Sequence, residues 1–131
     1  MRETILFAED EVMLAELVAH VLREEGYTVL LASDGMQALE VFHTHHESID
    51  IVLTDLQMPR LGGWDALQAI HTVNPKLPAI VASGFIDEKL ENEMLRKGVR
   101  HLIPKPYLPN DILRKVREVL DSSPATVAGV A

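Results

Sequence analysis

Three carboxylates in the sequence stand at the ends of two short apolar runs. Asp55 closes the run Ile49–Asp55, and Glu9 and Asp10 follow the run Thr4–Ala8. Runs of this composition are typical of strands buried on both faces of a sheet. If the two strands are neighbours, the three acids converge, and like charges in one small pocket repel. A hard divalent cation relieves this repulsion, and Mg²⁺ suits a site with few protein ligands and several waters.

A hydroxyl group and an ammonium group complete this set of polar residues. Ser83 precedes Gly84 after a third apolar run, and Lys105 precedes Pro106 after a fourth. The hydroxyl, the backbone N–H beside the glycine and the ammonium are donors suited to phosphoryl oxygens. Together with a nucleophilic carboxylate and a cation, they predict phosphoryl transfer onto Asp55.

Each of these residues also has an ordinary structural explanation. Asp55 could cap a loop or a helix, and Glu9 and Asp10 could cap the helix that follows them. Ser83 could simply belong to a Ser-Gly turn, and an isolated lysine such as Lys105 is usually solvated. Their joint position at four strand ends is what favours the chemical interpretation.

The elements that must position these residues alternate along the chain. The predicted strands are Thr4–Ala8, Tyr27–Leu31, Ile49–Asp55, Leu77–Ala82 and Leu102–Ile103. The predicted helices are Glu11–Glu25, Ser33 or Asp34 to about His45, Trp64–Val73, Asp87–Lys97 and Asn110–Leu120. The first helix has inward apolar positions three and four residues apart: Leu14, Leu17, Val18, Val21 and Leu22. Trp64 and the methionines are predicted to lie in the core or at its margin.

Five strands alternating with five helices predict an α/β fold, with a parallel sheet covered on both faces by right-handed crossovers. Pro104 is tolerated only at a sheet edge or a strand end, and the less apolar second strand, with Thr28, suits the other edge. The strand order 2-1-3-4-5 meets both conditions. It sets the first and third strands side by side at a topological switch point, where such sheets bind ligands.

Composition and charge narrow the classes of function. The 131 residues fit one domain, predicted at 1–121, followed by a flexible tail or linker at 122–131. A formal net charge of −8 argues against a nucleic-acid surface and favours a cation or a basic partner. The absence of cysteine, of a signal peptide and of an apolar run of roughly 20 residues predicts a cytoplasmic protein without a membrane span.

Taken together, the pattern resembles the receiver domain of two-component response regulators, over residues 3 to about 121. The resemblance rests on four motifs at strand ends: Glu9-Asp10, Asp-x-x-Met-Pro-x-x-Gly-Gly at 55–63, Ser83-Gly84 and Lys105-Pro106. Each motif alone is weak, but four in order at matching spacings are specific. The resemblance implies a flavodoxin-like receiver fold, and the Ser-Gly-Phe variant points towards receivers joined to hybrid histidine kinases.

The resemblance also implies roles for the acids. In such proteins the equivalent of Asp55 accepts a phosphoryl group from a histidine kinase or a histidine phosphotransfer protein, and partner affinity then changes. Mg²⁺ is held by Asp10, by Asp55 and by the main-chain carbonyl of Gln57, while Glu9 acts through water. The protein is therefore expected to be a signalling phosphoprotein that promotes only its own phosphorylation and dephosphorylation.

On the other side of the predicted pocket, Ser83 takes the position of the switch hydroxyl, and Lys105 pairs with the phosphoryl group or the acceptor. The Lys105–Pro106 bond is expected to be cis. The chain departs from the family pattern three residues before the lysine, where Leu102, beside His101, replaces the usual aromatic residue. Phosphorylation is expected to be intact, whereas the usual readout through an aromatic side chain is not.

Several alternatives remain beside this interpretation. The output surface for a downstream partner is expected on the face formed by 87–97, 102–103 and 110–120, but a degenerate receiver could bind partners without phosphorylation. A haloacid-dehalogenase type of phosphatase needs an acid where Gln57 stands, and a dinucleotide site needs a Gly-x-Gly-x-x-Gly motif that is missing after the first strand. The histidines at 43, 45 and 46 are expected to be solvated rather than to bind a metal.

Overall fold

The computed structural model describes residues 3–122 of the chain. Of the tail predicted at 122–131, all but Ser122 lies outside the described residues. The strands are β1 (Thr4–Ala8), β2 (Thr28–Ala32), β3 (Ile49–Asp55), β4 (Ala79–Ser83) and β5 (His101–Pro104). The helices are α1 (Val12–Glu24), α2 (Gly35–His45), α3 (Gly63–Val73), α4 (Glu88–Arg96) and α5 (Pro109–Asp121).

All five strands form one parallel sheet in the order β2-β1-β3-β4-β5, which confirms the predicted topology. Residue Ala8 of β1 pairs with Thr54 of β3, and Asp55 of β3 pairs with Ala82 of β4. The carboxyl ends of the three central strands therefore meet at one edge of the sheet. Pro104 closes the edge strand β5, as its missing N–H requires.

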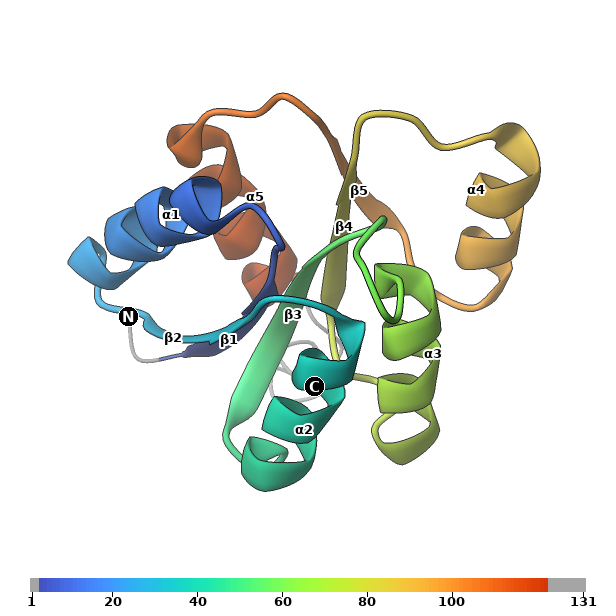
Figure 1. Ribbon diagram of the computed structural model, residues 1–131, viewed down its shortest axis with the longest axis horizontal. Coiled ribbons are helices and arrows are strands. Elements are labelled where there is room, and N and C mark those ends of the chain that lie inside the picture. Colours follow the sequence, from blue (N-terminus) through green and yellow to red (C-terminus); the bar gives the residue numbers. More distant parts are fainter. Residues whose placement is uncertain (1–2, 123–131) are drawn as a thin grey trace.

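Helices cover both faces of the sheet, with α1 and α5 on one face and α2, α3 and α4 on the other (Figure 1). Neighbouring side chains of a strand point to opposite faces, so the central strands supply two separate cores. Facing α1 and α5 are buried residues such as Ile5, Phe7, Ile51, Leu53 and Ile112. Facing the other three helices are buried residues such as Leu6, Val52, Leu67, Val81 and Met94.

Some inward positions differ from those predicted. Leu17 of α1 is exposed, and the buried stripe contains Ala15 and Ala19 instead, whose small side chains fit where the helix lies against the sheet. Trp64 is buried as predicted, but Met13 and Met36 are exposed and only Met94 among the described methionines is fully buried. Periodicity alone assigned too much weight to large apolar side chains.

The boundaries of β4 also moved. The prediction started this strand at Leu77 and ended it at Ala82, whereas the strand runs from Ala79 to Ser83. Leu77 is buried, but its N–H donates to the carbonyl of Asn74, so it belongs to the turn after α3. Within residues 3–122, no helix is both long and apolar enough to cross a membrane.

Candidate functional site

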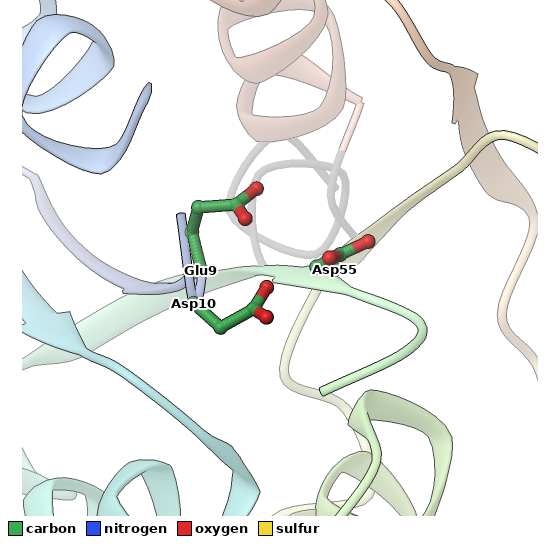
Figure 2. Close-up of side chains that lie close together, drawn as sticks. All are labelled: Glu9, Asp10 and Asp55. Carbon is green, nitrogen blue, oxygen red and sulfur yellow. The ribbon is translucent and has the colours of Figure 1, made fainter. Parts of the chain in front are cut away.

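Three carboxylates converge where β1 and β3 end, because those strands are adjacent and parallel. The side chains of Glu9 and Asp10 extend from the end of β1 towards Asp55 at the end of β3 (Figure 2). One carboxylate oxygen of each lies within 4.8 Å of those of the other two. Glu9 is 2% exposed and Asp55 7% exposed, whereas Asp10 faces solvent. The predicted convergence of the three acids is thus present.

One cation reaches this acidic cluster from the neighbouring edge of the sheet. The Lys105 Nζ lies 3.1 Å from Glu9 Oε1 and 3.2 Å from Asp55 Oδ2. The backbone N–H of Lys105 donates to the carbonyl of Ser83, and the Lys105–Pro106 bond is cis as predicted. Directly after the end of β5, the ammonium group of Lys105 thus contacts the two buried carboxylates.

The electrostatics of the cluster follow from this arrangement. Burial raises the pKa of Glu9 and the pKa of Asp55 above their ordinary values, and the hydrogen bond and charge of Lys105 offset only part of that rise. Burial would lower the pKa of Lys105, but the carboxylates of Glu9 and Asp55 outweigh it and raise that pKa. Lys105 therefore pairs with two of the three acids of the cluster, and the carboxylate oxygens of all three fit a hard cation such as Mg²⁺.

Glu9 has a second contact that bears on the capping alternative. Its Oε2 accepts a hydrogen bond from the backbone N–H of Glu11, the residue that precedes α1, at 3.0 Å. Glu9 therefore satisfies one donor at the start of the helix while its other oxygen binds Lys105. The structural and the chemical interpretations hold together for this residue, as the two oxygens of one carboxylate serve different partners.

The hydroxyl of Ser83 is engaged within its own turn rather than with the acids. Its Oγ donates to the carbonyl of Phe85 at 2.7 Å and accepts from the N–H of Phe85 at 3.1 Å. Ser83 is the residue after Ala82, the partner of Asp55 in the sheet, so its backbone is beside the acidic cluster. The structure therefore brings Ser83 to the right edge but directs its hydroxyl to the β4–α4 turn.

The loop after Asp55 is held against the end of β3. Leu56 donates to the carbonyl of Ala82, and Gly63 donates to the carbonyl of Leu56 at 2.8 Å. A Cβ at Gly63 would lie 1.9 Å from the carbonyl oxygen of Asp55, so only glycine permits this approach. Gln57 lies in this loop and is exposed. The Gly-Gly end of the motif thus lets α3 begin directly against the acidic strand end.

Two features near the site were not found from the sequence. The hydroxyl oxygen of Tyr107 is buried and has no hydrogen-bond partner among the described residues, and burial together with Glu9 and Asp55 raises its pKa. The side chain of Arg60 forms an ion pair with Asp34, 26 residues away. The sequence carried no signal for either, since both depend on how separate loops pack.

Comparison with known proteins agrees with this geometry. The family described as "Response regulator receiver domain" matches residues 5–117. The chain belongs to that family. Receiver domains are in general signalling modules rather than enzymes, and the acidic cluster is typical of their Mg²⁺ site and consistent with a phosphoacceptor function.

Relatives and solved structures extend this assignment. The receiver is 32% identical to the 3′,5′-cyclic-nucleotide phosphodiesterase regA of Dictyostelium discoideum and 32% identical to the autoinducer 1 sensor kinase/phosphatase LuxN of Vibrio harveyi. The matches cover 90% and 95% of this chain but only 15% and 14% of those proteins. A complex of CheX and CheY with BeF3 and Mg²⁺ from Borrelia burgdorferi aligns with a TM-score of 0.82 and 28% identity, over 89% of this chain and 88% of the other.

The histidines at 43, 45 and 46 have a structural explanation instead. The rings of His43 and His46 stand near Phe42, and His46 contacts the carbonyl of His43 at the end of α2. Among the described residues, the group of side chains spaced to hold a metal ion is the acidic cluster of Glu9, Asp10 and Asp55. The histidines thus belong to the end of their helix.

Proposed function

We propose that this receiver accepts a phosphoryl group on Asp55 from the phosphohistidine of a kinase or phosphotransfer protein and then changes its affinity for a partner. The observation that carries the proposal is the contact of Lys105 Nζ with both Asp55 and Glu9 at the carboxyl ends of the parallel strands. The buried carboxylate can act as a nucleophile, and the ammonium beside it can neutralise charge on the transferred group. The two further acids can help to bind a cation.

In the proposed reaction, an oxygen of Asp55 attacks the phosphorus of the phosphohistidine. The new O–P bond forms as the P–N bond breaks, and the histidine nitrogen leaves with the electron pair. Lys105 favours the ionised form of Asp55 for the attack and then binds a phosphoryl oxygen. Asp10, Asp55 and the main-chain carbonyl of Gln57 would hold Mg²⁺, with Glu9 acting through water, and the ion would supply positive charge to the transferring oxygens.

Ser83 would couple the phosphoryl group to the rest of the receiver. To donate to a phosphoryl oxygen, its hydroxyl must release the carbonyl of Phe85. That exchange would displace the β4–α4 turn, whose Phe85 side chain is 74% exposed, and with it α4. The partner surface would then be the face of α4, β5 and α5, with 1–121 acting as the signalling unit. Leu102, half-buried on β5, would take the place of an aromatic readout.

The direct test is intact mass spectrometry after incubation with acetyl phosphate, with and without Mg²⁺. We expect a gain of one phosphoryl group that requires Mg²⁺ and is lost in Asp55→Asn. Asp65→Asn, which neutralises an exposed acid in the first turn of α3, is the matched control and should still be phosphorylated. No gain in the unaltered protein would reject the proposal in favour of a receiver that binds partners without phosphorylation.

A further inference from the structure

We propose that the ion pair of Arg60 with Asp34 is a positioning device for the cation site. It fixes the β3–α3 loop so that the main-chain carbonyl of Gln57 is preorganised to join the carboxylates around Mg²⁺. The inference rests on the proposed function and adds two residues to it. Arg60 and Asp34 do not touch the reacting groups, so their contribution is to loop geometry.

The first observation is that both oxygens of the Asp34 carboxylate have hydrogen-bond partners. Its Oδ2 lies 2.8 Å from Arg60 Nε, and its Oδ1 accepts from the backbone N–H of Gln37 at the start of α2 at 2.8 Å. Asp34 is only 6% exposed, and the hydrogen bond from Arg60 keeps its pKa below the ordinary value. A carboxylate tied to a helix start is a rigid anchor for the arginine.

The second observation is the backbone of Arg60 itself. Its φ is +66°. Among the described residues, Arg60 is the only non-glycine residue with a positive φ. Glycine or asparagine would occupy this left-handed conformation with less strain than an arginine. An arginine that is held here against its backbone preference points to a role for its side chain, and that side chain is the one bound to Asp34.

A third contact joins the same two segments through their backbones. The N–H of Gly35 donates to the carbonyl of Leu61 at 3.0 Å, and a Cβ at Gly35 would lie 2.3 Å from that oxygen. The start of α2 is therefore packed directly on the loop that contains Arg60. Backbone hydrogen bonds of Leu56 and Gly63 hold the two ends of this loop. The contacts of Arg60 and Leu61 hold its middle.

Global stabilisation is a weaker explanation of the pair. The side chain of Arg60 is 60% exposed, so water screens its charge and weakens the contribution of the ion pair to the stability of the whole domain, although Asp34 is buried. Gln57, in contrast, is three residues from Arg60 within a short loop, so the conformation at Arg60 constrains the direction of its carbonyl. Residues that orient metal ligands without touching the metal commonly change metal affinity about tenfold or more.

The test is the dissociation constant for Mg²⁺, measured by isothermal titration calorimetry on the unphosphorylated protein. Arg60→Asn removes the ion pair but keeps a residue that tolerates the left-handed conformation. Asp34→Ser keeps a good helix cap but is too short to reach Arg60. We expect each variant to weaken Mg²⁺ binding by about tenfold, and the double variant to be no weaker than either single one.

Charge effects at a distance would give a different pattern. If only the field of these charges mattered, loss of the Arg60 cation would tighten Mg²⁺ binding while loss of the Asp34 anion would weaken it. Opposite signs in the two variants, or affinities equal to that of the unaltered protein, would overturn the inference. Urea unfolding of each variant confirms that it is folded at the titration temperature.

The same titrations separate this inference from the proposed function. If the unaltered receiver neither binds Mg²⁺ nor takes up phosphate, the proposed function fails. If it does both and the variants match it, only the role of the ion pair fails. As a second readout, the variants should raise the Mg²⁺ concentration needed for half-maximal phosphorylation and leave the rate at saturating Mg²⁺ close to that of the unaltered protein.

Discussion

At the scale of single residues, the acidic cluster holds more negative charge than Lys105 can balance. Glu9 and Asp55 are both buried, and burial raises the pKa of each above that of a carboxyl group in water. In the absence of a cation, the ionised form of Asp55 therefore opposes folding at neutral pH. The unfavourable free energy of these buried carboxylates, which a bound cation lowers, is the physical basis for cation binding at this point of the sheet.

We predict that Asp55→Asn stabilises the cation-free receiver at neutral pH. Because the pKa of Asp55 is higher in the folded state, the folded state binds more protons between the two pKa values. Stability of the unaltered protein therefore rises as the pH falls through the folded pKa, and this gain is complete below the ordinary carboxyl pKa. The advantage of the variant should shrink over the same interval.

Urea unfolding of both proteins in EDTA across mildly acidic to neutral pH measures this difference. Asp65→Asn, at an exposed position of α3, is the control for loss of one negative charge. Added Mg²⁺ should stabilise the unaltered protein more than Asp55→Asn. A variant that is less stable than the unaltered protein at neutral pH in EDTA would contradict the prediction.

The positions of the acids, the serine and the lysine could be predicted from the sequence because each lies at the end of an apolar strand or within two residues of it. Once the strand order is known, the pairing of Ala8 with Thr54 places the two acidic ends together. The pair of Arg60 with Asp34 could not be predicted in this way, since it depends on a left-handed residue inside a loop. The same holds for the hydroxyl of Ser83, whose direction is set by the local turn.

At the scale of elements, α4 is the helix with the fewest buried residues. Met94 is its one buried residue, and its remaining anchors include two side-chain contacts with α3. Trp64 Nε1 donates to Glu93 Oε2 at 2.8 Å, and Lys97 Nζ donates to Gln68 Oε1 at 3.1 Å. A helix attached in this way can shift as a unit when the turn before it changes.

We predict that Glu93→Ala loosens α4 without unfolding the domain. Loss of the carboxylate removes a hydrogen bond of about 1 to 2 kcal/mol to the indole of Trp64, which is buried. Amide hydrogen exchange in α4 should accelerate, and the fluorescence of Trp64, the single tryptophan of the chain, should change. Glu91→Ala, an exposed position of the same helix, should leave both unchanged. Equal exchange rates in the two variants would refute a tether through Trp64.

The start of α3 gives a second prediction at this scale. A Cβ at Gly63 would overlap the carbonyl oxygen of Asp55, whereas a Cβ at Gly84 has no atom within 4 Å. Gly63→Ala should therefore lower the free energy of unfolding by about 3 kcal/mol, because backbone has to move. Gly84→Ala should change it by less than about 0.5 kcal/mol. Similar losses in both variants would contradict this account.

At the scale of the whole molecule, the sheet separates two hydrophobic cores, one on each face. Ile112 belongs to the core under α5 and Ile70 to the core under α3. The strand order that creates these cores could be predicted from Pro104, which suits one edge of the sheet, and from the less apolar second strand, which suits the other. The exact inward residues could not, because Ala15 and Leu17, two residues apart, lie on nearly opposite sides of α1, and the large apolar residues alone indicated the wrong one as buried.

We predict that truncations in the two cores are additive. Ile112→Val and Ile70→Val should each cost about 1 kcal/mol of unfolding free energy, since each deletes one buried methylene. The double variant should equal the sum within about 0.5 kcal/mol, because the sheet lies between the sites. Chemical denaturation of the four proteins gives the comparison, and a coupling of more than 1 kcal/mol would show that the two cores respond as one.

The guanidinium of Arg117 has a consequence for the architecture of larger proteins. It contacts Glu3, directly before β1, and Asp121, the last residue of α5. The first and last elements are thereby joined at the edge of the sheet away from the acidic cluster. A module whose first strand and last helix are joined in this manner suits insertion into a loop of a host protein, with the acidic cluster kept away from the two junctions.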